Sequence, residues 1–112
     1  MGDYDRDGDI DLLTSHWTMR GNIARSAHLR ENIGNMLFSA KDSSKGLTSL
    51  VNSNDFTFSP AFADINGDGW LDILMAADFK AGQVYKNNNG LYVRATDTAA
   101  ITDKNGVAAA VA

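Results

Sequence analysis

The sequence predicts an all-β fold that contains two similar four-stranded units. A loop rich in Asp, Asn and Gly begins at Asp3, and a second loop of the same kind begins at Asp64. Each loop leads into a short apolar run, at residues 10–14 and 71–75, which is more typical of a strand than of an amphipathic helix. Each unit then contains an Asn/Gly-rich turn between further strand-forming residues. This repetition predicts the fold class.

The two loops share a spacing that suits a cation site, Asp-x-Asp/Asn-x-Asp-Gly-x-x-Asp. Oxygen atoms at positions 1, 3 and 5 of such a loop can converge on one point, and glycine at position 6 permits a sharp turn. Position 7 offers its backbone carbonyl, and position 9 offers a closing carboxylate. The candidate ligands are Asp3, Asp5, Asp7, Asp9 and Asp11 in the first loop, and Asp64, Asn66, Asp68, Trp70 and Asp72 in the second.

The chemistry of these ligands favours calcium. All are oxygen atoms, and Ca²⁺ accepts a high and flexible number of oxygen ligands, unlike Mg²⁺ or Zn²⁺. The sequence therefore predicts two Ca²⁺ sites. An EF-hand would need Glu at position 12, where Thr14 and Met75 stand. A solvated turn is the simpler interpretation of one such loop, since Asp, Asn and Gly dominate turns, but two copies in matching register favour a metal site.

Composition narrows the functional classes. The chain has 112 residues, the size of one small domain, and no Cys, which excludes disulfides and thiol chemistry. No apolar run approaches the roughly 20 residues that cross a bilayer, and the acidic N-terminus has no signal-peptide pattern. We therefore expect a soluble chain without a membrane partner, in a compartment that the sequence does not specify. The net charge of -4 and the absence of a basic stripe argue against nucleic-acid binding.

Much of the negative charge lies in the two loops. Eight of the fourteen acidic residues belong to them, and without cations these carboxylates would repel one another. Bound metal should therefore stabilise the fold.

Strand and turn signals divide the chain into two units. Residues 29–35 and 84–90 each read as a strand that enters an Asn/Gly turn, and residues 36–38 and 91–93 continue them as hairpins. Residues 60–63 would lead into the second loop, and residues 106–112 resemble such a lead-in strand again. Residues 41–46 and 52–55 read as polar connectors. The aromatic residues are expected to pack in the core: Trp17, Phe38, Phe62, Trp70, Tyr85 and Tyr92.

Four strands in about sixty residues match the size of a propeller blade. Residues 1–112 would form one unit of two permuted blades. Blade one spans about 3–42 and needs a lead-in strand, which residues 106–112 of a neighbouring copy would supply. Blade two spans about 58–98.

The repeated loop pattern resembles FG-GAP or VCBS-type repeats, the calcium-binding propeller blades of integrin alpha subunits and many bacterial secreted proteins. The resemblance covers essentially the whole chain, although the Phe-Gly and Gly-Ala-Pro signatures are absent and Asn66 replaces an Asp. It implies an extracellular or periplasmic location. The residues that the resemblance implies as calcium ligands are Asp3, Asp5, Asp7, Asp11, Asp64, Asn66, Asp68 and Asp72.

Propellers of this kind usually close with about seven blades, and two blades cannot close a ring. The first interpretation is a closed homo-oligomer, with a trimer that makes six blades favoured over a tetramer that makes eight. The second interpretation is a piece of a longer propeller.

Two functional classes remain open. The favoured class is a calcium-stabilised structural or interaction module that recognises a protein or glycan through its loops. The alternative is a metal-dependent hydrolase of phosphate or carboxylic esters, in which a cation polarises the substrate and activates water. No catalytic motif supports an enzyme. Residues 16–28 hold both histidines and form either an ordinary long loop or a binding loop for an anion or sugar.

Overall fold

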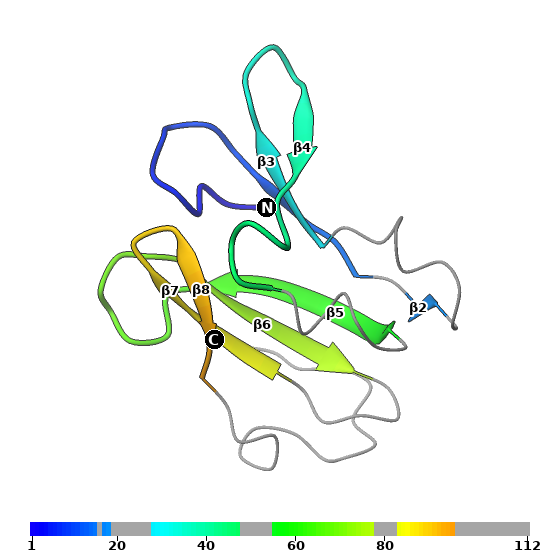
Figure 1. Cartoon of the computed structure of the whole chain (residues 1–112). Helices are drawn as coiled ribbons and strands as arrows, with labels where there is room; N and C mark the ends of the chain where they lie inside the picture. The colour runs from blue at the N-terminus through cyan, green and yellow to red at the C-terminus, as the bar shows by residue number, and fades with distance from the viewer. Residues whose placement is uncertain (16, 19–27, 48–54, 78–82, 96–112) are drawn as a thin grey trace.

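The computed structural model describes residues 1–15, 17–18, 28–47, 55–77 and 83–95. All regular elements in these ranges are strands, which confirms the all-β prediction. The strands form two open antiparallel sheets, in the orders β1-β3-β4 and β2-β5-β6-β7-β8 (Figure 1). Within the described ranges there is no helix long and apolar enough to cross a membrane.

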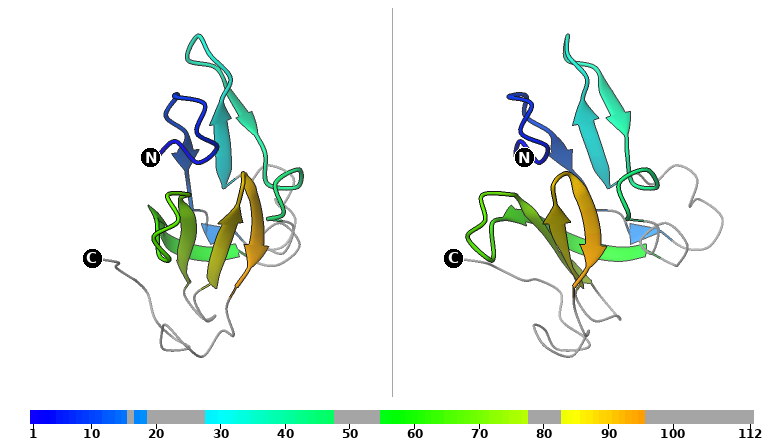
Figure 2. Two further views of the ribbon diagram at one scale, coloured as in Figure 1. Left: turned by 90° about the vertical axis from the view of Figure 1, so that its left-hand side faces the viewer. Right: turned by 60° about the vertical axis from the view of Figure 1, so that its left-hand side comes forward.

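The first sheet consists of β1 (Leu12–Leu13), β3 (Leu29–Asn32) and β4 (Phe38–Ala40), with β3 in the centre. Figure 2 shows the β3–β4 hairpin projecting beyond the second sheet, next to the N-terminal loop. The first sheet therefore has three strands within the described ranges.

The turn of this hairpin is longer than the sequence suggested. Gly34, Asn35 and Met36 all have positive φ angles, of 89°, 53° and 59°. A strand cannot contain such residues, so Met36 and Leu37 lie in the turn and β4 begins at Phe38. Phe38 is 38% exposed, so the prediction that it packs in the core is wrong.

The second sheet is built around β6 (Asp72–Ala77), which lies between β5 (Asp55–Ala63) and β7 (Gln83–Asn88). β2 (Trp17–Thr18) pairs with the beginning of β5. β5 contains the predicted lead-in strand but is longer, because its pairing with β6 and β2 continues the strand back to Asp55. The assignment of Asp55 to a polar connector is therefore corrected.

The β7–β8 hairpin follows the sequence closely. β8 (Leu91–Arg94) is joined to β7 by Asn89 and Gly90 alone. Both have positive φ angles, of 53° and 89°, which is the geometry of a type I′ turn. The Asn-Gly pair therefore fixes the register of this hairpin.

The core lies where the apolar run of β6 meets side chains from both repeats. Residues 73–76 are buried, as expected for a strand with a neighbour on each edge and cover on each face. β7 alternates, so that Tyr85 is buried while Lys86 is exposed. The core cluster comprises Tyr4, Leu29, Leu47, Ile73, Met75, Tyr85 and Tyr92, with Leu13 and Phe62 packed against it.

Asp42 anchors the segment after β4 to the start of β3. Its carboxylate accepts hydrogen bonds from the backbone N–H groups of His28 at 2.8 Å and Leu29 at 2.7 Å. The His28 ring nitrogen Nδ1 lies 3.2 Å from the same carboxylate, and the ring is fully buried. Burial alone would raise the pKa of Asp42, but these hydrogen bonds outweigh burial and lower the pKa.

Several predicted strands and blade boundaries involve residues that the structure does not describe. Residues 106–112, expected to form a lead-in strand, are outside the described ranges, as are residues 19–27. The limits of the two blades and the supply of a strand by another copy therefore stay predictions.

We expect Asp42→Asn to lower the free energy of unfolding by about 1–3 kcal/mol, because an amide offers one acceptor oxygen where the carboxylate offers two. Denaturant unfolding of the full chain measures this change. The control is Ser43→Ala, at an exposed neighbouring position. Equal stability of the two variants would contradict the anchoring role.

The same variant has a defined pH dependence. Because the folded-state pKa of Asp42 lies below its ordinary value of 3.8, the carboxylate stabilises the fold above that pH, and the stabilisation disappears as the pH falls through the folded pKa. The difference in unfolding free energy between the natural chain and Asp42→Asn, measured by denaturant unfolding, should therefore shrink as the pH falls below about 4.

Candidate functional site

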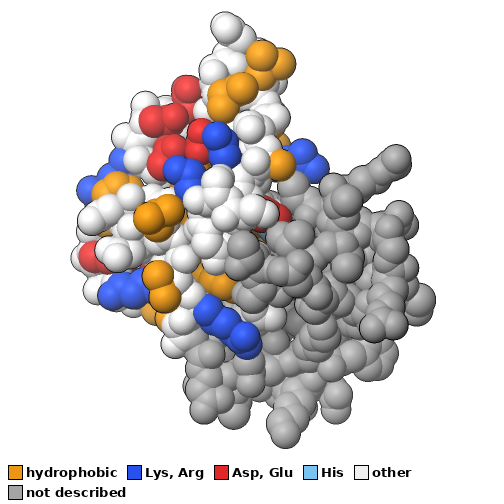
Figure 3. Space-filling view, viewed as in Figure 1, with side chains coloured by type: hydrophobic (Ala, Val, Ile, Leu, Met, Phe, Trp, Pro, Cys, Tyr) orange, Lys and Arg blue, Asp and Glu red, His pale blue; other side chains and the backbone are white. Residues whose placement is uncertain are grey.

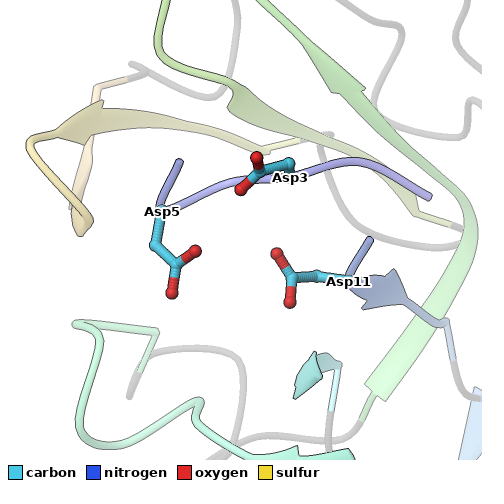
Figure 4. A group of neighbouring side chains, drawn as sticks. All are labelled: Asp3, Asp5 and Asp11. Atoms are coloured by element: carbon cyan, nitrogen blue, oxygen red, sulfur yellow. The ribbon is translucent and has the colours of Figure 1, made fainter. Parts of the chain in front are cut away.

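The first acidic loop, residues 3–11, turns three of its five carboxylates toward one point ahead of β1. Oxygen atoms from Asp3, Asp5 and Asp11 lie within 4.8 Å of one another. Figure 4 shows the three side chains facing a common space. Ligand distances of about 2.3–2.6 Å to Ca²⁺ allow two oxygens on one ion to lie up to about 5 Å apart. The spacing of these three carboxylates therefore fits a shared cation.

Backbone N–H groups hold the loop in this shape. Asp3 accepts hydrogen bonds from the N–H groups of Asp7 at 3.1 Å and Gly8 at 3.0 Å. Asp7 in turn accepts one from the N–H of Asp9 at 2.8 Å. Arg6 and Gly8 have positive φ angles of 63° and 95°, which lets the chain reverse within a few residues. The loop geometry is therefore set by local Asp-to-backbone bonds.

The second loop, residues 64–72, repeats these bonds. Asp64 accepts hydrogen bonds from the N–H groups of Asp68 at 3.1 Å and Gly69 at 2.8 Å. Asp68 accepts one from the N–H of Trp70 at 2.9 Å. At the position of Asp5, Asn66 directs its side-chain N–H₂ to Asp68 at 3.0 Å. The two loops therefore share one backbone design, but position 3 is charged only in the first. Among the described residues, carboxylates converge in the first loop and not in the second.

The carboxylate at position 9 joins the first loop to its sheet. Asp11 is fully buried and accepts hydrogen bonds from the N–H groups of Tyr4 at 3.1 Å and Asn32 at 2.9 Å. Tyr4 belongs to the loop and Asn32 ends β3. Asp11 therefore fixes the loop against the end of β3 while facing Asp3 and Asp5.

Asp72 plays the same part in the second repeat. It is 2% exposed and accepts hydrogen bonds from the N–H groups of Ile65 at 3.0 Å and Asn87 at 2.7 Å. The internal repetition therefore extends from the sequence pattern to individual hydrogen bonds.

A family model described as an FG-GAP-like repeat matches residues 3–75. The match begins at the first residue of loop one, ends in β6, and covers more than half of the 112 residues. The chain belongs to the FG-GAP-like repeat family. A search of curated proteins and a search of solved structures each found no match. Together with the two open antiparallel sheets, the family supports a β-propeller repeat module.

Burial and neighbouring charge make two loop carboxyl groups of this FG-GAP repeat harder to ionise. Burial raises the pKa of Asp5, and the adjacent Asp7 raises it further. Burial also raises the pKa of Asp11, despite the opposing hydrogen bonds from Asn32 and Tyr4. A cation among these carboxylates would relieve both effects, since it favours the ionised forms.

Other predicted ligands lie outside the group of converging carboxylates. Asp7 and Asp9 are exposed and lie outside the group of converging carboxylates formed by Asp3, Asp5 and Asp11. The side chain of Trp70 packs under the guanidinium of Arg6, 4.5 Å from the ring centroid, which leaves its backbone carbonyl as the predicted ligand atom.

Two asparagines that the sequence analysis assigned only to turns position the FG-GAP loops. Asn87 is 1% exposed, and its Nδ2 donates hydrogen bonds to the carbonyls of Leu71 at 3.0 Å and Tyr4 at 2.8 Å. Its Oδ1 accepts one from the N–H of Gly90 at 2.7 Å. The equivalent Asn32 accepts a bond from Gly34. An Asn shortly before the hairpin glycine of both repeats was the available sequence signal.

Tyr4 is another residue whose role sequence reasoning missed. It is fully buried, its ring lies 5.9 Å from that of Tyr92, and its hydroxyl donates a 2.5 Å hydrogen bond to Glu31. Glu31 also pairs with Lys41 at 3.3 Å and Lys45 at 3.9 Å. The first loop therefore contributes an aromatic side chain to the core.

Figure 3 shows acidic side chains gathered on one face with basic side chains directly beside them.

The segment at residues 16–28 is described only in part. Trp17–Thr18 forms β2, and His28 is buried against Asp42, so His28 does not lie on an open binding surface. His16 and residues 19–27 lie outside the described ranges.

We expect Asn87→Ala to lower the free energy of unfolding by about 2–3 kcal/mol, because it removes a donor from two carbonyls and an acceptor from one N–H in a buried setting. The matched control is Asn88→Ala, the next residue on β7, which is exposed. Denaturant unfolding measures both variants, and similar losses would show that the Asn87 side chain does not hold the FG-GAP loops together.

Proposed function

We propose that each acidic loop binds one Ca²⁺ and that the chain acts as a calcium-stabilised propeller repeat module with a structural and interaction role. The observation that supports this most directly is the convergence of the Asp3, Asp5 and Asp11 carboxylates within 4.8 Å. The second loop repeats the backbone hydrogen bonds of the first. In a propeller, loops of this kind at one face would recognise a protein or glycan.

The ligand sets follow the repeated pattern. Side-chain oxygens of Asp3, Asp5, Asp7 and Asp11 and the carbonyl of Asp9 would hold the first ion. The second ion would be held by the equivalent groups of Asp64, Asn66, Asp68, Trp70 and Asp72. The ion supplies positive charge that offsets carboxylate repulsion and burial. Because Asn66 is neutral where Asp5 is charged, the second site should bind more weakly.

Calcium titration of chelator-treated protein by calorimetry should detect two ions per chain. Asp5→Ala and Asn66→Ala change the same position of the two loops, and each should remove or weaken one ion. At a free calcium concentration of 100 times the dissociation constant, each ion should add about 2.7 kcal/mol to stability, measured as a rise in melting temperature.

Mg²⁺ at the same concentration is the control for ion selectivity, and we expect a smaller rise. We also expect no turnover of activated phosphate or carboxylic esters, which tests the alternative hydrolase function. The proposal would be contradicted if calorimetry detected no heat of calcium binding and calcium left the melting temperature unchanged.

We also propose that a strand from another copy or blade completes the first sheet. In the second sheet, β5 pairs with β6 from Thr57 to Ala63. At the corresponding edge of β1, only the bridge between Gly2 and Asp11 is present among the described residues. Residues 106–112 of a neighbouring copy would supply the missing pairing and lead to a closed homotrimer.

Exposed apolar side chains on the outer strands and turns support this assembly. Exposed apolar side chains that cluster on a surface indicate an interaction site, and these side chains would pack against the next blade. They are Ile33, Met36, Leu37 and Phe38 around the β3–β4 hairpin, and Leu91 and Val93 on β8.

Light scattering should give three times the chain mass in calcium and a lower mass after chelation. Removal of residues 106–112 should also lower the mass, because the strand that ties copies together is lost. A monomer under all these conditions would exclude the homotrimer and would favour the interpretation that the unit belongs to a longer propeller.

A further inference from the structure

A single side chain of the first loop reaches into the second loop. Arg6 donates hydrogen bonds to the carbonyl oxygen of Gly69 from Nε at 3.1 Å and from Nη2 at 2.6 Å. Its guanidinium also lies over the ring of Trp70, 4.5 Å from the centroid. Arg6 therefore contacts two consecutive residues of a loop that is 63 positions away in the sequence.

Arg6 has a backbone conformation that is unfavourable for a residue with a side chain. Arg6 has a φ angle of 63°, in the left-handed region that residues with a Cβ atom resist. The equivalent residue of the second loop is Gly67, with a φ angle of 77°. Glycine would fit this position with less strain, and the contact of the Arg6 side chain with the second loop offsets part of that cost.

The receiving position is shaped for this contact. Gly69 has a φ angle of 81°, and a Cβ atom added there would collide with Nη2 of Arg6. Gly8 occupies the same position of the first loop, and among the described residues nothing beyond its chain neighbours lies within 4 Å of its Cβ position. The glycine at 69 therefore serves both the turn and the approach of Arg6, whereas Gly8 serves the turn.

The contact reaches a proposed ligand through one rigid unit. The carbonyl of Gly69 and the N–H of Trp70 belong to the same planar peptide group. That N–H donates a 2.9 Å hydrogen bond to the carboxylate of Asp68. By holding the carbonyl, Arg6 holds the peptide plane that orients Asp68 and precedes the carbonyl of Trp70. Arg6 is therefore a positioning residue for the second site.

We propose that Arg6 couples the two cation sites, so that an ion in the first loop raises the affinity of the second loop. The inference rests on the proposed calcium binding. Arg6 lies between Asp5 and Asp7, two ligands of the first site, so an ion there fixes the backbone that presents the guanidinium. The second loop then loses less conformational freedom on binding. Such coupling is reciprocal, so an ion in the second loop also raises the affinity of the first.

Electrostatics alone predicts the opposite sign. Two divalent ions repel each other, so two neighbouring sites without a mechanical link should bind with equal or reduced affinity after the first ion. Positive coupling that depends on Arg6 is therefore a distinctive result.

The test is a set of calcium titrations on the full chain by calorimetry. The affinity of the second site is measured with the first site intact and in Asp5→Ala, and the affinity of the first site is measured with the second site intact and in Asn66→Ala. Both affinities should fall at least about five-fold when the other site is removed. In Arg6→Met the same two ratios should fall to about one or below, the result that electrostatics alone predicts.

Three further variants separate coupling from charge and from folding. Arg94→Met makes the same charge change at an exposed position of β8 and should leave the ratios unchanged. Arg6→Gly places the residue that the second loop has at this position, so it should fold and should still lose the coupling. Arg6→Lys keeps the charge but lacks the two-pronged donor, and should restore only part of the coupling.

Fluorescence gives an independent readout. The chain has two Trp residues, so Trp17→Phe leaves Trp70 as the sole reporter. In Trp17→Phe with Asn66→Ala, calcium bound at the first site should change Trp70 emission, and adding Arg6→Met should remove the change.

Unchanged ratios and emission in Arg6→Met would overturn the coupling while leaving two calcium sites intact. Absence of calcium binding by the natural chain would overturn both this inference and the proposed function.

Discussion

Each repeat depends on one buried carboxylate that ties a loop to its sheet. Asp11 and Asp72 are almost fully buried. Each accepts one N–H from its own loop and one from a strand, which is β3 for Asp11 and β7 for Asp72. A buried charge is costly unless hydrogen bonds and opposite charge compensate it. The two N–H groups supply the first of these requirements. A cation in the loop would supply the second, which links the proposed metal directly to the fold.

The two repeats form one unit because they share a core. Tyr4 leaves the first loop and stacks on Tyr92 of the second repeat. Asn87 of the second repeat donates to the carbonyl of Tyr4, and Tyr92 donates to the carbonyl of Leu71. In repeat architectures each unit buries its apolar face against its neighbour. Here the second loop would lose part of its support without the first loop. The hydrogen bond from Arg6 to the carbonyl of Gly69 is a further contact between the two loops.

The sequence was a good guide wherever structure is local. The loop spacing predicted the turns at both acidic loops, and the Asn-Gly pair predicted the β7–β8 hairpin. It was a poor guide at the β3–β4 hairpin, since Met36 in a left-handed conformation has no signature in an apolar run. It also missed Tyr4 and Asn87, because an aromatic between two Asp residues and an Asn in a turn look like surface residues until their distant partners are known.

The sequence by itself determined the all-β class, the repeated loops and their candidate ligands, because the bonds that shape these loops join residues at most a few positions apart. Only the tertiary structure decided which carboxylates converge and how the repeats lock together. Those contacts join Tyr4 to Asn87, and Arg6 to Gly69, across 83 and 63 positions. No local pattern encodes such pairs, since only the packing of the first loop against the second repeat brings these residues together.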